Sequence, residues 1–116
     1  MVNATITPDK QELSVRMTVL GHSGYAPSGS DIVCAWVSSL VQTFIATADI
    51  MHQNGDMRSL EYQLEPGIAD VYCRCDTEEE WRVLCTALAF VQTGLLLLER
   101  DYPRYIQVNG AERHIT

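Results

Sequence analysis

The chain has 116 residues, the length of one compact domain, and 47% of them are hydrophobic, too many for a disordered chain. We therefore expect a single domain over residues 1–116. The formal net charge is −7, from 15 acidic and 8 basic residues. Proteins that bind nucleic acid through its phosphates are usually basic, so this balance argues against direct nucleic-acid binding and is compatible with a basic peptide partner.

Neither the N-terminal segment nor the longest uncharged stretch indicates export or membrane insertion. Residues 1–7 mix polar and apolar side chains, unlike a secretory signal. Residues 83–98 are uncharged, but a membrane span needs about 20 mostly apolar residues, and Thr86, Gln92 and Thr93 interrupt this shorter stretch. With no export signal, the four cysteines are expected to be reduced thiols, so we expect a cytoplasmic protein.

The N-terminal part of the chain predicts two strands, a loop and the start of a helix. Apolar residues at positions 2, 4 and 6 alternate with polar ones, and a turn is expected at residues 8–11. A second alternation at positions 13, 15, 17 and 19 predicts a half-buried strand that ends just before His22. Glycine, proline and serine dominate residues 24–30, and Asp31 or Ser30 is expected to cap the helix that follows.

That first helix is expected to be well buried and to end near Asn54-Gly55. Apolar residues at helical spacing define one face of this helix, and further apolar residues beside them make the face wider. A wide apolar face is typical of a core helix. The face consists of Val33, Val37, Leu40, Phe44 and Ala48, widened by Ile32, Trp36 and Ile45.

The second half of the chain predicts a hairpin, a helix and a last strand. Alternating residues at 60–64 and 69–75 flank the turn Glu65-Pro66-Gly67. Thr77 and Glu80 have the spacing of a capping box, and apolar residues at 81, 84, 88, 91, 95 and 98 have helical spacing. Residues 105–108 can form an edge strand. The order strand-strand-helix-strand-strand-helix-strand predicts an α+β fold, a mainly antiparallel sheet with two helices packed on it.

The segment from His22 to Cys34 has the layout of a cysteine nucleophile and its base. His22 ends a strand, and Cys34 opens a helix, where unpaired backbone N–H groups and the helix dipole favour a thiolate. An imidazole within reach could accept and return a proton. Taken singly, Cys34 could be a buried small residue and His22 a structural strand-end histidine; their pairing across one loop favours catalysis.

The residues between this pair have several possible roles. Asp31 could cap the helix, with Cys34 at the third helical position, or it could orient His22, and both can hold at once. Gly24 and Gly29 are either ordinary turn glycines or hinges of a loop that closes over a peptide. Tyr25 and Ser28 are candidates for substrate contact. Backbone N–H groups near Cys34 are the expected oxyanion donors.

A metal site is not expected. Cys73 and Cys75 share one strand face with apolar neighbours, so core packing explains them, and Cys85 lies among apolar helix residues. No pair has the Cys-x-x-Cys spacing, and His52 and His114 lack ligand spacing. The apolar second helix, with leucine at all four positions 95–98, is expected to supply core contacts and to meet another subunit with part of its surface.

In the segment from His22 to Cys34 the sequence resembles the ribosomal-processing cysteine proteases, small bacterial enzymes known as Prp. The motif is a Gly-His pair, a loop with glycines, and a Cys-bearing helix start. A weaker match lies at the end of the second helix, and the resemblance spans nearly the whole chain. The matching residues are Gly21-His22, Gly24, Gly29, Asp31-Ile32-Val33-Cys34-Ala35 and Val37-Ser38, then Thr93-Gly94-Leu95 and Tyr102-Pro103-Arg104-Tyr105-Ile106.

The resemblance implies that Cys34 is the nucleophile and His22 the base of an endopeptidase. It implies a homodimer with a mobile loop between the two residues, and no metal or cofactor. The implied substrate is the N-terminal extension of a large-subunit ribosomal protein, the twenty-seventh by name. Two positions depart from the family pattern: Ser23 replaces an alanine and Trp36, facing the core or the cleft, replaces a small residue.

Two other functions remain open from the residues alone. One is a non-catalytic dimer that captures a peptide or the ribosome. The presence of both His22 and Cys34 argues against this function. The other is a small thiol-dependent acyl hydrolase or transferase. No glycine-rich phosphate-binding motif supports a carrier cofactor for it.

Overall fold

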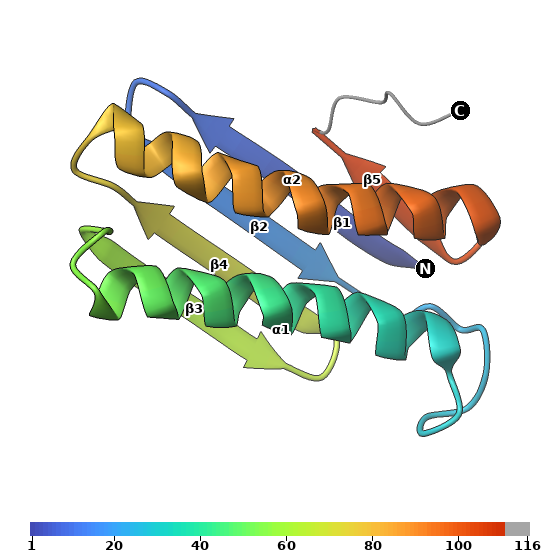
Figure 1. Ribbon diagram of the computed structural model, residues 1–116. Coiled ribbons are helices and arrows are strands. Elements are labelled where there is room, and N and C mark those ends of the chain that lie inside the picture. The colour runs from blue at the N-terminus through green and yellow to red at the C-terminus, as the bar shows by residue number, and fades with distance from the viewer. Residues whose placement is uncertain (111–116) are drawn as a thin grey trace.

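The computed structural model describes residues 1–110, which form one mixed sheet with two helices. The observed order of elements is the expected one. The elements are β1 (Val2–Asp9), β2 (Ser14–Leu20), α1 (Ile32–Gln53), β3 (Ser59–Glu65), β4 (Ile68–Arg74), α2 (Glu78–Asp101) and β5 (Ile106–Asn109) (Figure 1).

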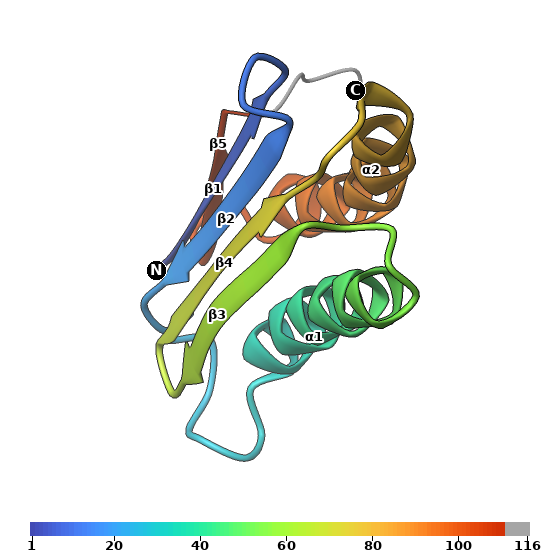
Figure 2. The ribbon, with the colours of Figure 1, turned by 90° about the vertical axis from the view of Figure 1, so that its left-hand side faces the viewer.

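The strands lie side by side in the order β3-β4-β2-β1-β5. Three of the four pairings are antiparallel, and β5 joins the far edge parallel to β1. The α+β fold class is therefore confirmed, with a mixed sheet. The parallel pair arises because α2 carries the chain from β4 across the sheet and returns it beside β1. Both helices cover the same face of the sheet, and residues 1–110 place no helix on the opposite face (Figure 2).

The core lies between the sheet and the two helices. Strand residues of one alternation, such as Ala4, Met17 and Val71, face the helices and are buried, and their neighbours on the opposite face are mostly polar. The expected core face of α1 is largely buried, but Leu40 is only half-buried. The prediction was wrong for Ile32 and Trp36, whose exposed fractions are 52% and 40%.

The wrong prediction has a geometric reason. A helix that packs on one sheet buries one stripe of side chains, and apolar residues outside that stripe stay exposed. Trp36 therefore faces neither the core nor the residues that line the cleft described below. Both helices have the length and hydropathy of a membrane span, a test that core helices also pass, and here each packs one apolar face on the sheet.

Each helix begins at a side-chain cap. The hydroxyl of Thr77 accepts the N–H of Glu80, whose carboxylate accepts the N–H of Thr77, so the expected capping box is present in α2. Asp31 is the N-cap of α1, and Asn54 its C-cap, followed by Gly55 in the left-handed region. The cap at Asp31 decides where the thiol of Cys34 lies.

Candidate active site

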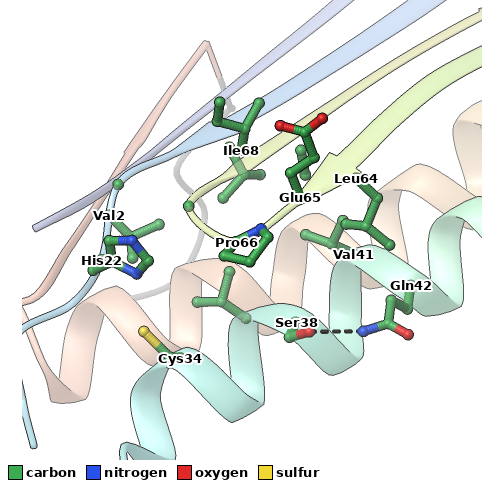
Figure 3. Close-up of a pocket in the computed structure, with 15 residues that line it drawn as sticks. Val2, His22, Cys34, Ser38, Val41, Gln42, Leu64, Glu65, Pro66 and Ile68 are labelled. Carbon is green, nitrogen blue, oxygen red and sulfur yellow. Dashed lines mark hydrogen bonds between the residues drawn. The ribbon is translucent and has the colours of Figure 1, made fainter. Parts of the chain in front are cut away.

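His22 and Cys34 lie in one cleft, at the end of the sheet where β2 enters the loop that leads to α1. Gly21, the residue after β2, donates its N–H to the carbonyl of Gly67 in the β3–β4 turn, at 2.9 Å. His22 follows directly. The loop then returns the chain so that the first turn of α1 carries Cys34. Figure 3 shows the sulfur of Cys34 pointing towards the imidazole of His22.

Asp31 joins the loop to the helix with both carboxylate oxygens. Its Oδ1 accepts the backbone N–H of Cys34 at 2.9 Å, and its Oδ2 accepts the hydroxyl of Ser23 and the N–H of Ala26. Burial raises the pKa of this carboxyl, but the hydrogen bonds from Ser23, Cys34 and Ala26 outweigh burial and lower the pKa from 3.8 to about 2. Asp31 is therefore a charged cap, and none of its hydrogen bonds goes to His22.

Ser23 connects this carboxylate to the thiol. Its backbone N–H points at the sulfur of Cys34, 3.4 Å away, while its hydroxyl donates to Asp31 and accepts the N–H of Tyr25. An N–H directed at a sulfur stabilises the thiolate more than the thiol. Ser23, which departs from the family pattern, thus lies buried between the helix cap and the thiol of Cys34.

Two of the backbone N–H groups expected to stabilise an oxyanion at the helix start already form hydrogen bonds. The N–H of Cys34 is bonded to the Asp31 carboxylate, and the N–H of Ala35 to the Asp31 carbonyl at 3.0 Å. Neither can stabilise an oxyanion without leaving its present acceptor.

The cleft has two hollows that meet at the same three residues, His22, Cys34 and Ser38. One, of about 430 Å³, runs between α1 and the β3–β4 turn and is lined mainly by apolar side chains, among them Val41 and Leu64 (Figure 3). The other, of about 470 Å³, lies under the 22–31 loop. An extended chain placed across Cys34 would occupy one hollow on each side of the sulfur.

Three of the four loop candidates line the second hollow, namely Gly24, Ser28 and Gly29. Tyr25 is not among its lining residues. Its ring instead makes edge contacts with Tyr102 and Tyr105, at centroid distances of 5.5 and 5.2 Å. These contacts attach the loop to the segment between α2 and β5.

Sequence reasoning did not propose Ser38 or Gln42 as site residues. They follow Cys34 by one and two helical turns, so they face the same cleft, and the Gln42 amide donates to the Ser38 hydroxyl at 2.7 Å (Figure 3). The i, i+4, i+8 spacing from Cys34 was the available signal. Gly67 carried no such signal, because it reaches the site only through the β2–β4 pairing.

The other three cysteines are packing residues. Burial raises the pKa of Cys73 to about 12 and that of Cys75 to about 11, with further contributions from nearby acidic groups and thiols. Burial also raises the pKa of Cys85. Among residues 1–110, no three His, Cys, Asp or Glu side chains converge as a metal site would require; His114 lies outside the described residues.

A thiol on the first turn of a helix, beside an imidazole in an open cleft, defines the class of thiol-dependent hydrolases. The chain matches the family model of the cysteine protease Prp over residues 1–107. The chain therefore belongs to the Prp family and is a cysteine protease. A search of curated proteins finds no match.

Solved structures have the same fold. A structure of the essential ribosomal processing protease Prp from S. aureus with a covalently linked product peptide superposes with a TM-score of 0.67 at 20% identity, covering 94% of this chain and 98% of that one. The same protease with a substrate peptide gives 0.65 at 18% identity and the same coverage. SMU.848 from Streptococcus mutans gives 0.64 at 21% identity, covering 94% and 92%.

Proposed function

We propose that this protease removes the N-terminal extension of a large-subunit ribosomal protein, the twenty-seventh by name, using Cys34 as nucleophile and His22 as base. The observation that carries the proposal is the cleft, in which the thiol and the imidazole stand where two hollows meet. An extended peptide needs this layout, because residues on both sides of the scissile bond must be held.

The reaction follows from the two side chains. The sulfur of Cys34 attacks the scissile carbonyl carbon as its proton passes to the His22 imidazole. The tetrahedral intermediate collapses, the C–N bond breaks, and the imidazolium protonates the leaving amine. Water, deprotonated by His22, then attacks the thioester, which releases the N-terminal segment as a carboxylate and restores the thiol.

The roles of the supporting groups follow from their contacts. Asp31 holds the backbone of Cys34 and the start of the loop, and the Ser23 N–H favours negative charge on the attacking sulfur. Among the described residues the His22 imidazole has no hydrogen-bond partner, so no hydrogen bond has to break before it accepts the proton of the thiol.

Two observations support a ribosomal protein as substrate. The S. aureus relative is described as a ribosomal processing protease and was solved with its substrate peptide and with a product peptide. Ribosomal proteins are basic because they contact RNA, and the net charge of −7 on this chain favours encounter with a basic segment.

The test is mass spectrometry of the extended ribosomal protein after incubation with the native protease, with Cys34→Ala and with Cys85→Ala. Cys85 is a matched control, because it is also half-buried on a helix but lies outside both hollows. We expect one N-terminal cut by the native protein and by Cys85→Ala, and none by Cys34→Ala. A folded native protein that leaves this substrate intact would contradict the proposed substrate.

We also propose that the protease is a cytoplasmic homodimer. Phe90 and Val83 on α2 have exposed fractions of 78% and 56% and lie two turns apart on one side of the helix, an apolar surface suited to a second copy. Light scattering should give twice the mass of the chain, and Phe90→Asp should give the monomer. A native monomer at working concentration would refute the dimer; recovery of the tagged protein in the membrane fraction would refute the cytoplasmic location.

A further inference from the structure

Among residues 1–110, no carboxylate forms a hydrogen bond with the imidazole of His22, as one does with the base in many hydrolases. Asp31, the nearest candidate in the sequence, accepts its hydrogen bonds from Ser23, Ala26 and Cys34. Within the described residues His22 forms no side-chain hydrogen bond and is exposed in the cleft. The position of the ring therefore depends on what the ring packs against.

The β3–β4 turn provides that limit. Leu20, the last residue of β2, pairs with Ile68, and one step further the N–H of Gly21 donates to the carbonyl of Gly67 at 2.9 Å. This bond brings the turn against the residue that follows Gly21. Pro66, whose ring restricts φ, stiffens the turn. Both Pro66 and Gly67 line the cleft, and Figure 3 shows Pro66 beside His22.

The ring occupies the space where a side chain at position 67 would stand. A Cβ built on Gly67 would lie 2.8 Å from His22 Nε2, 3.2 Å from Cε1 and 3.4 Å from Cδ2. The first distance is too short for any real contact, so even the smallest side chain would displace the ring. Because an imidazole can turn about its side-chain bonds, the fold would survive while the base moved.

We propose that Gly67 is a positioning residue for His22. Because Gly67 has no side chain, the imidazole can occupy this space and stays in the cleft, beside Cys34. The inference rests on the proposed roles of His22 and Cys34. Gly67 contributes no group to the reaction, and its effect reaches the reaction only through the ring.

The chain contains a matched control for this proposal. Gly55 has a φ of +80°, against +79° for Gly67, so a side chain has to adopt the same left-handed φ at both positions. A Cβ on Gly55, however, has no atom within 4 Å. Gly55→Ala therefore reports the cost of the backbone conformation alone, and Gly67→Ala reports that cost together with displacement of the ring.

The experiment needs no peptide substrate. The first readout is the rate of Cys34 alkylation by iodoacetamide as a function of pH. Near neutral pH this rate reports Cys34, because the thiols of Cys73 and Cys75, with pKa values of about 12 and 11, and of Cys85, with a raised pKa, stay protonated. The second readout is the NMR titration of the His22 ring, with the exposed His52 as internal control.

We expect both variants to lose similar thermal stability. Gly67→Ala should lower the alkylation rate below neutral pH by about tenfold or more, towards that of His22→Ala, because a misplaced base loses a contribution of this size. It should also move the His22 signals but not those of His52. Gly55→Ala should stay within about twofold of the native protein. Equal alkylation profiles and unmoved His22 signals in Gly67→Ala would overturn the proposal.

Asparagine variants cover the case in which alanine at position 67 prevents folding. Asparagine tolerates a positive φ better and brings the same Cβ, so Gly67→Asn and Gly55→Asn repeat the comparison at lower backbone cost. If the ribosomal substrate remains uncut while Gly67→Ala still changes the alkylation profile, the proposed substrate is wrong and the proposed role of Gly67 in positioning His22 is supported.

Discussion

The substitution Asp31→Asn should produce a loss of stability that depends on pH. Asparagine keeps an oxygen for the Cys34 N–H but loses the charge that Ser23 and Ala26 stabilise. The pKa of Asp31 lies at about 2, below its ordinary 3.8, so the unfolded chain binds a proton more readily than the folded one between these values. The gap corresponds to about 2 kcal/mol of native stability, present above about pH 4 and lost as the pH falls towards 2.

Urea unfolding, followed by circular dichroism at several pH values, measures this difference. The native protein should exceed Asp31→Asn by about 2 kcal/mol at neutral pH, and the two should converge near pH 2. Asp56→Asn is the control, since Asp56 is exposed and its carboxylate forms no hydrogen bond or ion pair among the described residues. A difference for Asp31→Asn that stays constant with pH would refute the charged cap.

Three further changes test other contacts. Ser23→Ala should cost about 1–2 kcal/mol in urea unfolding, because it removes a buried hydroxyl donor to a charged acceptor; an unchanged midpoint would count against that bond. Tyr25→Ala should speed cleavage of the 22–31 loop by subtilisin, since the ring leaves its two tyrosine neighbours, whereas Tyr25→Phe should not; equal rates would mean that the ring does not hold the loop. Leu95→Ala should cost about 3 kcal/mol and Thr43→Ala, on the solvent side of α1, less than about 0.5, and similar losses for the two would contradict the packing.

The local elements could be read from the sequence, whereas their long-range pairing could not. Alternation at Val15, Met17 and Val19 follows from one buried sheet face, and the capping box at Thr77 is a local motif. The parallel pairing of β5 with β1 depends on where α2 returns the chain, a tertiary effect without a local signal. Trp36 was misassigned for the same reason, because its exposure depends on how α1 lies against the sheet.

In the candidate site, too, local features could be predicted from the sequence and long-range contacts could not. The spacing of His22 and Cys34 across a glycine-rich loop predicted that they would share a site, and both line the same cleft. The two roles considered for Asp31 could be distinguished only by the path of the loop, which directs its oxygens to backbone N–H groups and to Ser23. Gly67 could not be found from the sequence, because strand register alone brings it to the imidazole.

The most direct test of the central claim, that Cys34 attacks the peptide, is to quench the protease in acid during turnover of the extended ribosomal protein and map the covalent adducts by mass spectrometry. We predict a thioester between the N-terminal segment of the substrate and Cys34, absent from Cys34→Ala and from the thiols of Cys73, Cys75 and Cys85. Cleavage that proceeds in Cys34→Ala, or an adduct on another cysteine, would contradict it.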